Sequence, residues 1–491
     1  MYSSQCLLKL SLMGLAAAIV AFGADPLPRI RVADNQRYLA TEHGQPFFWL
    51  GDTCWRMMLK AVTSDRTDQP SIDKYFKNRA AKGFNIVQTR IVGGGNDEGA
   101  DGYLAFEEGD FSRPLVVDGP GNDFWDRIDR IIDRGAAHGM YFALLPVWAN
   151  SVANEHQWVQ DPSSAYRYGH FLGSRYRDRT HIVWIMGGDM YAPERGVDDP
   201  KRMIMVRAMT EGVADGVSGV DSYDGAADWD RSLMSYHPPG NNRSSSQFFH
   251  NEPWVDFNMI QTTTRFTFAN YNTVAFDYAR TPVKPTFECE VAYEESLPLN
   301  ARDRAQRPGA RIGPWDVRRA AYWSVFAGGF GFTYGNRNFI SWLRKGETSS
   351  NGAYRPWYDS LDTPGAFDMT HLKALMESRP FLSRIPDDSI LVDGGHESPD
   401  RLVATRDRDG RYVLVYAPTG RDITVVMSSV SGDTVKAWWF NPRDGTSAAI
   451  GNFPAEGTRT FEPPTTAYGP DWVLVLDDEA EQFSPPGSLE R

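Results

Sequence analysis

Short apolar runs alternate with longer amphipathic stretches through most of the chain, and this alternation constrains the fold more than any other feature. The apolar runs lie at 47–50, 85–89, 141–145, 182–186, 233–236, 257–260, 285–287 and 330–333. Helical patterns separate several of them, as at 71–76, 124–132 and 316–323, and Gly83 and Gly139 stand where glycine commonly ends a helix. Eight buried strands alternating with helices predict an α/β fold, a (β/α)8 TIM barrel, over residues 24–384. A doubly wound open sheet is the alternative.

The pattern changes after residue 385, where short strands with polar alternation and tight turns predominate. Strands are expected at 401–405, 412–417, 423–427, 435–440 and 471–476, with hairpin turns at Asp409-Gly410 and Asp444-Gly445. This texture predicts an antiparallel β-sandwich domain over 385–491. Trp438 and Trp439 are neighbours in a strand and therefore face opposite ways. We expect one to pack in the core of this domain and the other against the barrel.

The first 23 residues have the layout of a cleaved secretory signal peptide. One cation, Lys9, precedes an apolar run at 10–22, and small residues follow before Asp25-Pro26. The run is too short for a typical membrane span, and no later stretch is long and apolar enough to cross a bilayer. The sequence therefore predicts a secreted or periplasmic protein without a membrane span in its mature form, with an uncleaved N-terminal anchor helix as the alternative.

Charge and composition narrow the class of ligand. The chain of 491 residues has 63 acidic and 51 basic residues, a net charge of −12, which disfavours nucleic acid as a partner. Aromatic residues make up 13%, which suits either stacking on sugars or a large aromatic core. Cys54 and Cys289 remain after signal removal and are expected to be buried free thiols. No cysteine or histidine spacing typical of a metal site occurs, so no metal and no cofactor are expected.

Acidic residues follow predicted strands four and seven, at the end of the barrel where catalytic groups gather. Asp189 follows the fourth strand and Glu290 the seventh. Glycoside hydrolysis needs two facing carboxyl groups, one to protonate the leaving oxygen and one to attack or stabilise the anomeric carbon. Residues on different strand ends can converge across the barrel mouth in this way. Asp189 and Glu290 are therefore the candidate catalytic pair.

Two other acids compete with this pair. Asp52 ends the first predicted strand, and Glu288 shares a strand face with Glu290 in an extended chain. A structural alternative exists for each of these acids, because strand-end carboxylates also cap helices or pair with arginines such as Arg90 or Arg243. A reaction through an activated serine is disfavoured, since no Gly-x-Ser-x-Gly turn follows a strand.

Aromatic and amide side chains at the other strand ends are candidates to bind a sugar. Aromatic faces pack on the apolar side of sugar rings, and amides bond to hydroxyl groups. The glycines at 93–95 lack the residues of a phosphate loop and indicate a mobile loop over the pocket. The candidate substrate-binding residues are Asp52, Trp148, His237, Gln261, Glu288, Tyr334 and Asn336.

Several motifs together resemble one known family. They are Tyr38-Leu39-Ala40, Pro46-Phe47-Phe48-Trp49-Leu50-Gly51-Asp52-Thr53, Arg79-Ala80-Ala81-Lys82-Gly83-Phe84-Asn85, Trp184-Ile185-Met186-Gly187-Gly188-Asp189, Asp256-Phe257-Asn258-Met259-Ile260-Gln261 and Arg318-Arg319-Ala320-Ala321-Tyr322-Trp323. The chain thereby resembles the apiosidase-like glycoside hydrolases, glycoside hydrolase family 140. The stretch at 435–445 resembles the β-domain, labelled collagen-binding, that usually follows the catalytic domain in this family.

The resemblance implies a fold and a reaction. It implies a (β/α)8 catalytic domain, a retaining mechanism with Asp189 as acid/base and Glu290 as nucleophile, and action on apiose linkages in plant pectin, as in rhamnogalacturonan-II-like side chains. One motif departs from the family, which commonly has Gly-Glu-Pro where this chain has Cys289-Glu290-Val291 preceded by Glu288. Glu288 is thus the alternative nucleophile. The other hypotheses are a glycosidase of another furanoside or pyranoside and a non-catalytic carbohydrate- or collagen-binding protein.

Overall fold

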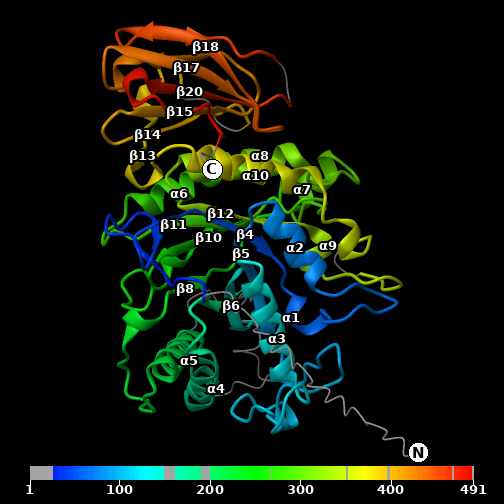
Figure 1. Ribbon diagram of the computed structural model, residues 1–491. Helices are drawn as coiled ribbons and strands as arrows, with labels where there is room; N and C mark the ends of the chain where they lie inside the picture. Colours follow the sequence, from blue (N-terminus) through cyan, green and yellow to red (C-terminus); the bar gives the residue numbers. More distant parts are fainter. Residues whose placement is uncertain are drawn as a thin grey trace, which may run out of the picture.

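The structure is a computed structural model that describes residues 26–148, 161–188, 200–266, 268–349, 352–394, 399–466 and 469–488. The expected signal peptide at 1–23 and the candidate acid Asp189 lie outside the described residues. Figure 1 shows two bodies stacked on each other, a large one of mixed strands and helices and a smaller one of strands.

Eight parallel strands form the large body, as the apolar runs predicted. They are β4 (Trp49–Thr53), β5 (Ile86–Val92), β6 (Tyr141–Val147), β7 (Ile182–Gly187), β8 (Met234–His237), β10 (Asn258–Thr263), β11 (Thr286–Val291) and β12 (Gly331–Gly335). The sheet order is β8-β7-β6-β5-β4-β12-β11-β10, and the short strand β9 (Arg243–Ser244) pairs antiparallel with β10. This is the wound order of a TIM barrel, and the open-sheet alternative is excluded.

The two ends of this sheet, β8 and β10, close the barrel through a few hydrogen bonds rather than a regular ladder. The backbone N–H of Asp256 donates to the Met234 carbonyl at 2.9 Å, and the Met234 N–H donates to the Asp256 carboxylate at 2.6 Å. The Ser235 hydroxyl donates to the Phe257 carbonyl at 2.5 Å. Burial raises the pKa of Asp256 to about 7. Polar side chains therefore replace ladder bonds at this one seam.

Helices between the strands cover the outside of the barrel. Gly83 and Gly139 end two of them with φ of 75° and 77°, the left-handed backbone that the sequence predicted there. The helices are α1 (Met57–Lys60), α2 (Asp73–Ala81), α3 (Phe124–Ala137), α4 (Pro162–Tyr176), α5 (Pro200–Ser218), α6 (Asn270–Tyr278), α7 (Ala301–Gln306), α8 (Pro314–Phe326), α9 (Arg337–Ile340) and α10 (Pro364–Glu377).

A small antiparallel sheet precedes the barrel and changes one expectation. It consists of β1 (Ile30–Val32), β2 (Leu39–Thr41) and β3 (Pro46–Phe47). The apolar run at 47–50 was predicted as one strand, but its first residue, Phe47, pairs with Leu39 in this sheet while the barrel strand starts at Trp49. One continuous apolar run thus contributes residues to two sheets, because both sheets are buried where this run lies.

The smaller body is the predicted antiparallel β-domain. A sheet ordered β13-β14-β15-β20-β17-β18 faces a two-stranded ribbon, β16 with β19, and apolar residues of both fill the space between them. Gly410 and Gly445 have φ of 81° and 71° in the two predicted hairpins. The strands are β13 (Arg384–Pro386), β14 (Val403–Asp407), β15 (Tyr412–Ala417), β16 (Ile423–Val426), β17 (Thr434–Phe440), β18 (Ser447–Pro454), β19 (Thr458–Phe461) and β20 (Trp472–Asp478).

The β-domain packs directly on α8 and α10 of the barrel, as Figure 1 shows. Trp439 lies in the core of the β-domain, whereas Trp438 on the opposite face belongs to the core shared with the barrel, as expected. Arg318 on α8 donates two hydrogen bonds of 2.8 Å to the buried carboxylate of Asp471, at the start of β20. The interface therefore combines apolar contact with a buried, bidentate ion pair.

Two further features are settled by the described residues. Cys54 and Cys289 are both buried and are not joined to each other by a disulfide, as the sequence predicted. Within the described part of the chain, no helix has the length and apolar character needed to cross a membrane.

Candidate active site

A β-bulge in β11 separates the two glutamates that were expected to share a face. Ile260 on β10 pairs with Glu288, and the next residue, Gln261, pairs with Glu290, so that Cys289 is the extra residue. A bulge re-aims side chains and interrupts the two-residue alternation of a strand. The surroundings of Glu288 and Glu290 differ accordingly.

Glu288 is held inside the protein by its neighbours. Its side chain is fully buried, and its carboxylate accepts hydrogen bonds from the Thr262 backbone N–H at 3.0 Å and from the Thr262 hydroxyl. The Glu290 backbone N–H lies 3.4 Å from the same carboxylate. Burial raises the pKa of Glu288 to about 8. These contacts tie the ends of β10 and β11 together and leave Glu288 no face toward a ligand.

Glu290 instead faces the barrel mouth beside a histidine. Its side chain retains 11% exposure, and Oε2 lies 3.3 Å from Nε2 of His237, which ends β8. His237 Nδ1 lies 3.0 Å from the carbonyl of Pro238, which can only accept, so Nδ1 carries a proton. Nε2 is consequently the ring atom directed at Glu290. The structure thus brings together two residues that the sequence nominated from different strands.

Aromatic rings form a wall next to this pair. The Trp148 and His237 ring centres are 5.8 Å apart, and the Trp55 ring packs edge-on to both, at 4.8 Å from Trp148 and 5.2 Å from His237. Trp148 was expected at the site, whereas Trp55 was missed although it lies two residues beyond the first barrel strand. Its position after β4 was the available signal.

Two more buried polar groups lie next to Glu290, on β10 and just beyond β11. The Gln261 side-chain oxygen is buried and has no hydrogen-bond partner among the described residues, and the buried Tyr293 hydroxyl lies close to Glu290 and Thr53. Burial, and next the charge of Glu290, hold the pKa of Tyr293 well above its usual value, which places this phenol near that carboxylate. Gln261 was a predicted sugar contact. Tyr293 was not predicted as a site residue, and the one indication in the sequence was its position just beyond β11.

Asp52 lies on the other side of its strand. Its neighbours Gly51 and Thr53 face the barrel interior, where a Cβ on Gly51 would lie 2.7 Å from the Thr333 hydroxyl. The Asp52 carboxylate therefore points outward and accepts hydrogen bonds from Arg79 at 2.6 Å and Tyr75 at 2.8 Å on α2. Asp52 is fully buried there. Its pairing with an arginine matches the structural role that the sequence analysis gave as the alternative to substrate binding.

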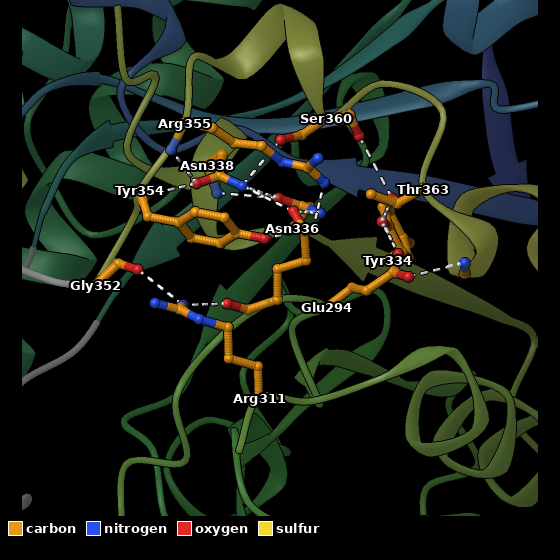
Figure 2. A network of polar contacts seen from close by, with 12 residues as sticks. Glu294, Arg311, Tyr334, Asn336, Asn338, Gly352, Tyr354, Arg355, Ser360 and Thr363 are labelled. Atoms are coloured by element: carbon orange, nitrogen blue, oxygen red, sulfur yellow. Dashed lines mark hydrogen bonds and ion pairs between the residues drawn. The ribbon is translucent and has the colours of Figure 1, made fainter. Parts of the chain in front are cut away.

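Tyr334 and Asn336 also bind the protein itself. The Tyr334 hydroxyl donates to Glu294 at 2.5 Å, and the Asn336 amide donates to Glu295 at 3.1 Å. Asn336 additionally caps α9 by accepting from the Asn338 N–H at 3.0 Å. Figure 2 shows both residues inside one network that joins the loops after β11 and β12. Their polar groups order these loops, and both side chains are fully buried.

The chain that leads to Asp189 runs along the aromatic wall. Gly187 and Gly188 have φ of 93° and 113°, which favour glycine. A Cβ on Gly188 would lie 2.9 Å from the Trp148 ring, and one on Gly187 would lie 2.6 Å from the His237 carbonyl. The two glycines preceding Asp189 thus pass closer to the site than any other residue type permits.

The arrangement has the parts of a carbohydrate site. A carboxylate, an imidazole, an amide and a phenol gather at the carboxyl end of a barrel beside two indole rings. Among the described residues, no cluster of three or more histidine, cysteine or acidic side chains suits a metal ion.

Comparison with known proteins gives consistent matches. The model of the family "Apiosidase-like, catalytic domain" matches residues 33–383, and "Putative collagen-binding domain of a collagenase" matches 385–477. A solved structure titled "Glycoside hydrolase" is 31% identical, with a TM-score of 0.80, over 92% of this chain and 97% of its own. A glycoside hydrolase family 5 structure from Bacteroides vulgatus is 30% identical, with a TM-score of 0.79, over 92% and 93%. A search of curated proteins returned no match.

Proposed function

The chain belongs to the apiosidase-like family of glycoside hydrolases, and from this premise we propose that it cleaves apiose linkages of plant pectin by a retaining mechanism. Glu290 is the nucleophile and Asp189 the acid/base. The single observation that carries the assignment of Glu290 is its position 3.3 Å from His237 at the barrel mouth, while Glu288 is closed off inside the protein.

The reaction has two steps in this proposal. Glu290 attacks the anomeric carbon and forms a glycosyl ester, while Asp189 gives a proton to the leaving oxygen as the glycosidic bond breaks. Asp189 then takes a proton from water, and the resulting hydroxide displaces Glu290 from the sugar. His237, 3.3 Å from Glu290, holds this carboxylate in position for attack and again when the ester breaks. The aromatic wall packs against the apolar face of the sugar.

The substrate and the location rest on the family and on the N-terminal sequence. The family is named for apiosidase activity, and apiose occurs in the side chains of pectin. A signal-like segment at 1–23 supports a secreted or periplasmic enzyme that meets such glycans outside the cytoplasm. The packing of the β-domain on α8 and α10 supports a role as a structural partner of the barrel.

The test is hydrolysis of an apiose-bearing pectic oligosaccharide by the mature chain. We expect wild type to release apiose and Glu290→Gln and Asp189→Asn each to lose about 10³-fold or more in kcat. Glu288→Gln is the matched control, because it makes the same change two residues away and is expected to keep most activity. Proton NMR of the first-formed anomer reports retention. Loss of activity in Glu288→Gln alone would instead make that residue the nucleophile.

A further inference from the structure

The chain reverses direction just after Glu290 and brings Tyr293 back beside it. Ala292 follows the last residue of β11 and has φ of 45°, a left-handed backbone that residues other than glycine seldom adopt. A Cβ on Gly335, which ends β12, would lie 2.3 Å from the Tyr293 ring, so this ring packs on bare backbone. Backbone strain of this kind persists where the surrounding structure enforces it. The turn therefore fixes the Tyr293 hydroxyl next to Glu290.

Arg337 is a buried cation beside the same ring. It begins α9, and its guanidinium carbon lies 5.8 Å from the centre of the Tyr293 ring. Its Nε and Nη2 donate to the Ser296 hydroxyl at 3.0 and 2.8 Å. The Ser296 hydroxyl is neutral, and Arg337 makes no ion pair within the described part of the chain. A buried charge normally has a compensating charge nearby, so an anion is expected close to this guanidinium.

The charge of Glu290 supplies this compensation. Burial lowers the pKa of Arg337, and negative charge on Tyr293 and on Glu290 opposes that effect. Burial also holds the pKa of Tyr293 well above its usual value, so the phenol is neutral at ordinary pH and leaves Glu290 as the source of negative charge. Arg311 is a second cation that acts on Arg337, and it adds to the effect of burial. Arg337 and Glu290 therefore stabilise each other's charged forms beside the Tyr293 ring.

The two acids of the loop after Tyr293 are engaged by other groups. Glu295 forms an ion pair with Arg355. Glu294 accepts hydrogen bonds from a tyrosine hydroxyl at 2.5 Å and from a backbone N–H at 3.0 Å, and burial raises its pKa. Glu290 thus remains the acid whose charge is available to Arg337.

We propose that Arg337 is a positioning residue that, together with Tyr293, holds Glu290 ionised and in place for attack. This rests on the proposed function, because it concerns the nucleophile of that reaction. A nearby cation favours the ionised form of a carboxyl group, which is the form that attacks the anomeric carbon. The other titratable groups that face Glu290 among the described residues are His237 on β8 and Glu288 on β11. Neither carries a permanent positive charge, whereas Arg337 does.

The test follows the ionisation of Glu290 itself, in the full mature chain labelled with carbon-13 at the glutamate side-chain carboxyl groups. The Glu290 signal is the one missing from Glu290→Gln, and its chemical shift is recorded against pH without any substrate. We expect Arg337→Met to raise the titration midpoint by about one pH unit, because removal of a cation disfavours the ionised form. Arg337→Lys keeps a positive charge and should raise it by about half as much or less.

Tyr293→Phe is the second variant, since it keeps the ring and removes the hydroxyl beside the carboxylate. It should also raise the midpoint, because a hydrogen bond to the ionised form favours that form. An unchanged midpoint in Arg337→Met would overturn the proposal. Should that variant fail to fold, an unchanged midpoint in Tyr293→Phe would overturn it instead.

Arg384→Met is the matched control for a loss of packing. Arg384 is also a buried arginine without an ion pair among the described residues, and it donates to the Val325 and Gly329 carbonyls at 2.5 and 2.7 Å, before the start of β12 rather than after its end. It should leave the Glu290 midpoint unchanged, and a shift equal to that of Arg337→Met would contradict the proposal. If the wild type releases no apiose but Arg337→Met shifts the midpoint, the proposed substrate fails and the role of Arg337 stands.

Discussion

At the scale of single residues, surroundings rather than residue type separate the two glutamates of β11. Glu288 is closed in by backbone and hydroxyl donors of Thr262, whereas Glu290 keeps partial exposure and faces His237. A nucleophile must reach the anomeric carbon, and the carboxyl of Glu288, fully buried and bonded to Thr262 of the neighbouring strand, does not. The burial of Glu288 instead affects the stability of the protein.

The raised pKa of Glu288 predicts that stability falls as pH rises. This carboxyl has a pKa of about 8 in the folded protein and about 4.3 when unfolded. The stabilisation that the protonated Glu288 gives the folded protein is therefore fully present below the pKa of the unfolded state. It is lost as pH rises through the pKa of the folded state. Glu288→Gln keeps the shape of the protonated side chain but does not titrate. We expect the free energy of unfolding of wild type to decline relative to this variant between pH 5 and pH 8, as measured by denaturant titration. A constant difference across that range would contradict the prediction.

At the scale of elements, α4 and α5 pack with their backbones in contact. Gly169 and Gly173 of α4 face Gly212 and Gly216 of α5, each pair spaced by four residues so that it lies on one helix face. A Cβ on any of the four would approach a backbone oxygen of the other helix to between 2.1 and 2.4 Å. Figure 1 shows the two helices side by side. Their close approach sets the position of the barrel wall behind β6 and β7.

Gly173→Ala tests this contact. The added methyl group would lie 2.2 Å from the Val213 carbonyl oxygen, so the helices must move apart. Overpacking of this kind costs about 1–3 kcal/mol, and we expect a lower Tm in thermal unfolding. Gly94→Ala is the control, because a Cβ there meets no atom within 4 Å. An unchanged Tm for Gly173→Ala would show that the helices tolerate a wider spacing.

At the scale of the whole molecule, the two bodies share one core. Arg318 and Arg379 of the barrel form bidentate ion pairs with Asp471 and Asp477 of the β-domain, all four buried. Trp438 contributes to the shared core beside these pairs. Separation of the bodies would expose apolar area and leave unpaired charges. The β-domain is therefore expected to stabilise the barrel.

Removal of that contact tests this role. A chain ending at Ser383 should be insoluble or lack a cooperative unfolding transition. Arg318→Met should cost about 3–5 kcal/mol because it leaves the buried carboxylates of Asp368 and Asp471 without their cation. Arg421→Met is the control, since its partner Asp393 has a side chain that is 68% exposed and stays solvated without the arginine. A truncated chain that stayed soluble, folded and fully active would contradict the packing role.

The sequence by itself determined the order of elements and the nature of the strand ends. Apolar runs at regular intervals specify buried strands wherever they occur, and glycines such as Gly83 and Gly410 mark turns that need left-handed backbone. These are local properties, so the barrel, the β-domain and the two faces of Trp438 and Trp439 were predictable. His237 and Glu290 were each named as site candidates because each ends a barrel strand, and the structure places them 3.3 Å apart.

Only the tertiary structure decided which strand-end side chains face the mouth. A bulge at Cys289 leaves no trace in residue type, yet it separates Glu288 from Glu290. Asp52 points to α2 because Gly51 and Thr53 occupy the inner face of β4, and Tyr334 and Asn336 find partners in loops distant in sequence. Burial and pairing depend on contacts between such distant segments. Local sequence specifies elements, whereas these long-range contacts specify the site.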